Sequence, residues 1–147
     1  MTTLANKVVW ITGASGGIGE ALAQLAALRA ARLILSARRA DELQRVRGNC
    51  ADPAKVAVLP LDLTAFDAAQ AAAAAADFFG PVEMLVNNAG ATQRSMTLDT
   101  DMAVYRRLME LDYFAPVALT RAVLPGMVEH GSGHVVMVSS VAGKFGA

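Results

Sequence analysis

The chain has 147 residues, of which 54% are hydrophobic and 18% charged, so we expect one domain with a substantial core. Its 13 basic residues balance 13 acidic residues and form no basic stripe, which argues against a nucleic-acid partner. Cys50 is the only cysteine, the first residues lack a secretory pattern, and no apolar run approaches about 18 residues, so we expect a cytoplasmic protein without a membrane span.

Short apolar runs alternate with longer helical patterns along the chain. Each run is rich in Val, Ile and Leu and lacks strict alternation, which is typical of strands covered on both faces of a parallel sheet. The expected strands are 7–12, 32–37, 55–61, 83–88 and 134–140.

Helices are expected between these strands. The first follows Gly17, where Ile18, Leu22 and Leu25 form one apolar stripe at helical spacing. A short second helix covers 40–48.

The third helix is expected to open at Asp62-Leu63-Thr64 and to run through the alanine-rich segment 67–79. We interpret that segment as a helix packed closely on the sheet, not as a functional tract. A fourth helical region covers roughly 99–130, and Pro116 and Pro125 should bend it or mark turns.

This β-α alternation with right-handed crossovers predicts an α/β fold with helices on both faces of a parallel sheet, in strand order 3-2-1-4-5. In that order, 134–140 is an edge strand that is almost wholly apolar. Such an edge exposes unpaired backbone groups. We therefore expect further strands beyond the chain end.

The stretch "WITGASGGIG" joins the first strand to the first helix, and Gly13, Gly17 and Gly19 follow the pattern G-x-x-x-G-x-G. A helix start presents free N–H groups and a partial positive charge, and glycine lets an anion approach the backbone closely. No lysine completes a phosphate loop of the triphosphatase type. The turn is predicted to hold a pyrophosphate; the alternative is a structural turn without a ligand.

Four motifs, "TGASGGIG" (12–19), "LDLT" (61–64), "NNAG" (87–90) and "VMVSSVAG" (136–143), stand in order at the ends of expected strands. Together they resemble the motifs of the short-chain dehydrogenase/reductase family. The resemblance implies a Rossmann-type doubly wound sheet, a nicotinamide dinucleotide cofactor, and interconversion of an alcohol and a carbonyl. It covers only the N-terminal portion of the family's usual domain of about 250 residues.

The same resemblance assigns cofactor-binding residues. The pyrophosphate would be bordered by the first motif, the adenine by the second and the adenosine ribose side by the third. The residues so implied are Gly13, Ser15, Gly17, Ile18, Gly19, Asp62, Leu63, Asn88, Ala89 and Gly90. For Asn87 and Asn88 a structural role, as buried amides tying strands together, stands beside the binding role.

The second expected strand ends in "SARR", residues 36–39, and no acidic residue follows until Asp41. A carboxylate here would favour the ribose hydroxyls of NAD(H), whereas a guanidinium binds a 2′-phosphate. We therefore expect Arg38, assisted by Ser36, to select NADP(H). NAD(H) is the alternative, with Arg38 and Arg39 as solvated charges.

The resemblance further implies that Ser140, next to Ser139, orients the substrate oxygen. Asp112 stands where the family usually has the Asn that supports a proton-relay water. Asp lacks the amide donor, so it either holds the water through an acceptor oxygen or weakens the relay. Neither Tyr105 nor Tyr113 begins the family's Tyr-x-x-x-Lys, which would fall about a dozen residues after Ser140 in the family pattern.

We thus interpret residues 1–147 as the N-terminal portion of one dinucleotide-binding domain, ending before the Tyr-x-x-x-Lys segment. The first hypothesis is an NADP(H)-dependent oxidoreductase acting on a small alcohol or carbonyl substrate, with this chain inactive alone. The alternative is a non-catalytic dinucleotide-binding module or an inactive truncated product. The resemblance also implies a homodimer or homotetramer, because the long fourth helix often forms a subunit interface in that family. The spacing of His130 and His134 is no metal signature.

Overall fold

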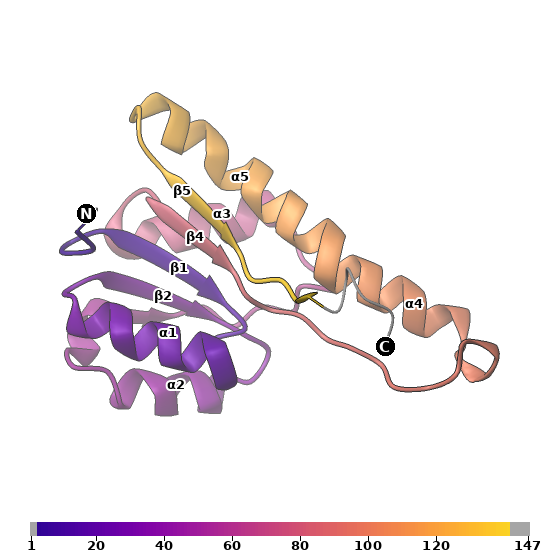
Figure 1. Ribbon diagram of the computed structural model, residues 1–147. Coiled ribbons are helices and arrows are strands. Elements are labelled where there is room, and N and C mark those ends of the chain that lie inside the picture. The colour runs from indigo at the N-terminus through magenta and orange to yellow at the C-terminus, as the bar shows by residue number, and fades with distance from the viewer. Residues whose placement is uncertain (1–2, 142–147) are drawn as a thin grey trace.

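The computed structural model describes residues 3–141 of the chain. Within them lies one parallel sheet of order β3-β2-β1-β4-β5, which confirms the predicted α/β fold and strand order. Figure 1 shows its twisted strands with helices on both sides. The strands are shorter than predicted: β1 Val8–Thr12, β2 Arg32–Ser36, β3 Val56–Val58, β4 Met84–Asn87 and β5 His134–Met137.

The helices alternate with the strands along the chain. Between β3 and β4 lies one helix, and between β4 and β5 a continuous helical region of three segments (Figure 1). The main helices are α1 Gly17–Leu28, α2 Ala40–Gly48, α3 Ala68–Phe79, α4 Met102–Met109 and α5 Ala115–Glu129. Shorter turns are η1 Pro53–Lys55, η2 Thr97–Asp99 and the π-helical η3 Glu110–Phe114.

The core has two halves, one on each face of the sheet, because successive strand residues point to opposite faces. Val9 and Ile11 of β1 pack with α1 and α2. Val8 and Trp10 pack with α3 and α5 on the other face, and Trp10 is fully buried. The expected covering of the central strands on both faces is therefore confirmed.

The predicted apolar stripe of α1 is only partly buried: Leu22 packs against the core, but the other two members do not. Ile18 is 63% exposed and Leu25 56% exposed. The buried face of α1 instead carries Gly19, Ala23, Ala26 and Ala27. Small residues let the helix backbone approach the sheet closely, so side-chain size, not hydrophobicity alone, selects the buried face.

The third helix begins later than predicted. Asp62 accepts hydrogen bonds from the Thr64 N–H (2.9 Å) and hydroxyl (2.7 Å), which makes a local turn. Asp67 is the N-cap of α3 and accepts from the Gln70 N–H at 2.9 Å. The alanine-rich helix does pack on the sheet, as predicted, through buried Ala71 and Ala75.

Within the region predicted as helical, residues 102–129 form one continuous helical rod from α4 through η3 to α5, and no turn interrupts it at either proline (Figure 1). The N–H of Ala115 bonds to the carbonyl of Glu110, five residues back, which is a π-type bond. Pro116 has no N–H to donate, and its ring would clash with the carbonyl of the preceding turn of a regular α-helix. The wider π-helical segment before it lets the helix continue without a break. Pro125 lies inside α5.

Strand β5 forms the edge of the sheet that the structure describes, with Val86 of β4 opposite Val136. Its side chains are exposed, in contrast to the expected covering on both faces; Met137 is 54% exposed. The strands expected beyond β5 lie outside the described residues.

Candidate functional site

A cavity of about 710 Å³ lies at the edge of the sheet where β1 to β4 end. Its walls come from the four loops that follow these strands and from α4 and η3. Open parallel sheets bind ligands at this edge. The lining residues are Gly13, Ser15, Gly16, Ile18, Ala37, Arg38, Arg39, Leu61, Asp62, Leu63, Thr64, Asn88, Ala89, Gly90, Ala91, Arg107, Leu108 and Leu111.

The glycine turn after β1 forms one wall. Gly13 has φ +65°, and a Cβ there would lie 2.7 Å from the Cα of Ala89, so only glycine fits. A Cβ at Gly19 would overlap the Gly13 carbonyl and lie 2.6 Å from Asn88 Nδ2. Gly17 has φ +57° with open space around it, and α1 begins there. The turn thus exposes the first N–H groups of α1 beside the cavity.

Thr12 and Asn88 join the first loop to the fourth. The Thr12 hydroxyl accepts from the N–H groups of Asn88 and Ala89, both at 3.1 Å, and donates to the Val86 carbonyl at 3.3 Å. Asn88 Nδ2 donates to the carbonyls of Thr12 (3.0 Å) and Gly13 (3.2 Å). These bonds show that Asn88 has a structural role here as well as lining the cavity.

Thr12 is a residue that the sequence interpretation missed. It is 1% exposed and does not line the cavity itself. Its hydrogen bonds hold in place the loop after β4, which does line the cavity. A polar residue ending a buried strand directly before a glycine is the signal that marks it.

Asn87, the neighbour of Asn88, is buried between β4, β5 and α5. Its Nδ2 donates to Thr120 Oγ1 at 3.4 Å and to Met137 Sδ at 3.3 Å. Asn87 does not line the cavity and ties these elements together.

The loop after β2 brings Arg38 and Arg39 to the cavity wall, where both side chains are exposed. Ser36, which was predicted to assist Arg38, is not among the residues that line the cavity. Its hydroxyl accepts from the Trp10 indole N–H at 2.9 Å, and the residue is 1% exposed. Ser36 pairs with Thr12 and shares a sheet face with Trp10, which explains this inward direction.

The loop after β3 contributes an apolar floor and one carboxylate. Leu63 is buried, whereas Asp62 is exposed. Hydrogen bonds from the Thr64 N–H and hydroxyl hold the pKa of Asp62 below its usual range, and the charge of Arg38 acts in the same direction. Asp62 is therefore ionised at neutral pH.

Helix α4 supplies a wall that was not predicted from the sequence. Arg107 and Leu108 of α4, together with Leu111 of η3, line the cavity. The i, i+3 spacing of Leu108 and Leu111 indicates one helix face, but the sequence does not say where that face packs. The lining side chains carry the charges of Arg38, Arg39 and Arg107 against that of Asp62, so the cavity favours an anion.

The two predicted catalytic residues lie outside the cavity lining. Asp112, in η3, accepts from the Ala91 N–H at 2.9 Å and so contacts the loop after β4. Ser140 follows β5 and is exposed. Gly17 and Gly19, also predicted for the cofactor, shape the turn without lining the cavity.

Residues 3–141 contain neither a membrane-spanning helix nor a metal-binding cluster of side chains. No helix there is long and apolar enough to cross a bilayer. No group of three or more His, Cys, Asp or Glu side chains in the same residues is arranged to hold a metal ion.

Known proteins are similar to this chain in sequence and in fold. The family model described as short chain dehydrogenase matches residues 7–147. Human dehydrogenase/reductase SDR family member 7 is 46% identical over 95% of this chain. The zebrafish (Danio rerio) SDR family member 7B is 43% identical over 97% of it.

Solved structures are also similar to this chain in fold and sequence. A short-chain dehydrogenase from Streptomyces avermitilis matches 98% of this chain with a TM-score of 0.89 and 39% identity, and serine dehydrogenase from Escherichia coli matches 95% with a TM-score of 0.86 and 27% identity. The chain spans 43% of the human relative, 48% of the zebrafish relative, 53% of the first structure and 65% of the second. By its family match and its fold, the chain belongs to the short-chain dehydrogenase family.

Proposed function

We propose that the cavity binds NADP(H) and that the protein transfers a hydride between an alcohol and a carbonyl. The observation that carries this proposal is that loops from four strands, predicted separately, line one cavity. Those predicted residues are Gly13, Ser15, Ile18, Arg38, Asp62, Leu63, Asn88, Ala89 and Gly90.

The glycine turn fits a dinucleotide's diphosphate. A Cβ built at Gly16 or Gly17 would have no other atom within 4 Å, so no side chain crowds the start of α1, where free backbone N–H groups suit phosphate oxygens. The tight contacts of Gly13 and Gly19 fix that backbone in place. Aliphatic side chains of Leu63, Leu108 and Leu111 suit the flat face of an adenine, and Asp62 lies beside them.

Arginines favour the phosphorylated cofactor. Arg38 follows β2, at the position from which an acidic residue would bind the ribose hydroxyls of NAD(H). With Arg39 and Arg107 on the same cavity, the walls favour the additional charge of a 2′-phosphate.

The test compares NADPH and NADH binding to the unaltered chain and to Arg38→Ala by titration calorimetry. Loss of a charge-assisted contact should weaken NADPH binding about tenfold or more and leave NADH binding nearly unchanged. Arg106→Ala is the matched control, because Arg106 is exposed on the same protein but does not line the cavity. Equal weakening of both dinucleotides, or none, would contradict the assignment.

For the reaction, we propose that Ser140 orients the substrate oxygen and that Asp112 positions the loop after β4. The dinucleotide supplies or accepts the hydride when bound. The Asp112 carboxylate already accepts from the Ala91 N–H, which leaves its second oxygen as an acceptor for water. The acid–base Tyr and Lys are proposed to come from sequence other than residues 1–147, so these residues alone should bind a dinucleotide without turnover.

We also propose self-association through the outer face of the α4–α5 rod. Apolar side chains there are exposed to an extent that favours contact with a second copy. They include Met109, Tyr113, Phe114, Val117 and Leu124, which are between 42% and 55% exposed.

A further inference from the structure

Glu20 places a negative charge in the first turn of α1, directly after the glycine turn. Its N–H donates to the carbonyl of Gly16, the N-cap, at 3.3 Å. A carboxylate at a helix start is attracted by the partial positive charge there. It would also repel a second anion bound at the same helix start.

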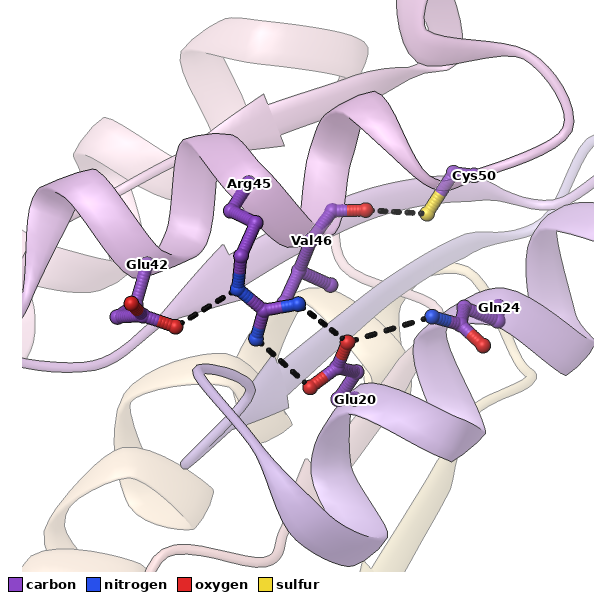
Figure 2. A network of polar contacts seen from close by, with 6 residues as sticks. All are labelled: Glu20, Gln24, Glu42, Arg45, Val46 and Cys50. Atoms are coloured by element: carbon purple, nitrogen blue, oxygen red, sulfur yellow. Dashed lines mark hydrogen bonds and ion pairs between the residues drawn. The ribbon is translucent and has the colours of Figure 1, made fainter.

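Arg45 of α2 binds this carboxylate with two hydrogen bonds (Figure 2). Arg45 Nη1 and Nη2 donate to Glu20 Oε1 and Oε2 at 2.8 and 2.9 Å. Arg45 Nε donates to Glu42 Oε2 at 2.8 Å, and Gln24 Nε2 donates to Glu20 Oε1 at 3.4 Å. Hydrogen bonds from Arg45 keep the pKa of Glu20 below its usual range, so the carboxylate is ionised at neutral pH.

We propose that Arg45 is a positioning residue for cofactor binding: it neutralises Glu20 and holds the carboxylate toward α2, so that the start of α1 accepts a dinucleotide's diphosphate. This inference rests on the proposed function. Neither Glu20 nor Arg45 lines the cavity, so Arg45 acts through Glu20 and not by touching the ligand.

A purely structural ion pair between α1 and α2 predicts a different pattern. In that case removing either partner breaks the same contact, and both single variants should affect binding alike. If Arg45 serves to neutralise Glu20, the effects are unequal. Loss of Arg45 leaves Glu20 and Glu42 uncompensated, whereas loss of the Glu20 charge removes the repulsion itself.

The experiment measures NADPH and NADH dissociation constants for the full chain carrying Arg45→Gln, Glu20→Gln or both, at low ionic strength. Arg45→Gln should weaken both dinucleotides about two- to fivefold, which matches the usual size of charge effects at a helix end. Glu20→Gln should not weaken binding, and the double variant should bind as Glu20→Gln does. Raising the salt concentration should shrink the Arg45→Gln effect.

Two further variants serve as controls. Lys55→Gln removes a cation from the exposed ion pair with Asp52 (3.5 Å), before the start of β3 at the opposite edge of the sheet, and should leave binding unchanged. Arg45→Lys keeps the charge and should bind almost as the unaltered chain does. Thermal unfolding shows whether each variant is folded. If Arg45→Gln is not, Arg45→Lys still tests the inference.

Two results would overturn the inference: Glu20→Gln weakening binding as much as Arg45→Gln, or Arg45→Lys failing to preserve binding in a folded protein. Either leaves the proposed function intact if the unaltered chain binds dinucleotide. If the unaltered chain binds neither NADPH nor NADH, the proposed function and this inference both fail.

Discussion

The Thr12 hydroxyl connects the end of β1 to the loop after β4, two segments that form walls of the cavity. The substitution Thr12→Val tests that role. Valine has nearly the same shape and keeps the packing, but it can neither accept from the Asn88 and Ala89 N–H groups nor donate to Val86. Three hydrogen bonds at about 1 kcal/mol each, with part of the loss recovered by water, predict a fall of about 2–3 kcal/mol in the free energy of unfolding.

Thr12→Ser is the matched variant, because it keeps the hydroxyl and loses one buried methyl group, at a cost of about 1 kcal/mol. Urea denaturation of the full chain measures both values. Because Asn88 to Gly90 line the cavity, Thr12→Val should also weaken dinucleotide binding more than Thr12→Ser does. Equal stability of the two variants would refute the assigned role of this hydroxyl.

Two more predictions concern the glycine turn and the opposite edge of the sheet. Gly19→Ala should cost about 1–3 kcal/mol of stability through overlap with the Gly13 carbonyl and Asn88, whereas Gly16→Ala, with open space and an extended φ of 173°, should cost much less; thermal denaturation of the pair decides. Burial alone would raise the pKa of Glu83, but hydrogen bonds from Lys7 Nζ and the Val8 N–H hold it below its ordinary value of 4.5. Because the folded pKa is the lower one, this stabilisation is present above pH 4.5 and is lost as the pH falls through the folded value, so Glu83→Gln should flatten the acid side of the stability profile, and an unchanged profile would contradict this.

The fold was predictable because its signals are local. Apolar runs rich in Val, Ile and Leu mark strands covered on both faces, and the short helices between them leave few ways to connect parallel strands. The start of α3 was not predictable in the same way. Asp62 and Asp67 are both good capping residues, and the choice between them depends on Asp62 bonding to Thr64 instead.

The buried face of α1 shows a similar limit. Leucine and isoleucine carry the stronger hydrophobic signal, yet Ala23 and Ala26 face the sheet because the helix lies close to it. Closeness is a property of the assembled layers, and no local pattern encodes it.

The candidate site likewise contains residues that local motifs predicted and residues whose place depends on tertiary packing. Motifs at the ends of four strands were predicted to meet, because the carboxyl ends of parallel strands share one edge of the sheet. Arg107 was missed because its place depends on how α4 lies against that edge of the sheet. The motifs after β1, β2 and β3 are far from α4 in the sequence and do not indicate this. Ser36 was predicted to assist Arg38 at a 2′-phosphate, and the alternation along β2 turns its hydroxyl toward Trp10, which no local pattern indicated.

A crystal structure of the full chain with NADP⁺ tests the central proposal most directly. The account predicts the diphosphate against the backbone of the Gly13–Gly19 turn, the adenine between Leu63 and α4, and the 2′-phosphate at Arg38. A dinucleotide bound elsewhere, with the cavity between these loops empty, would contradict it.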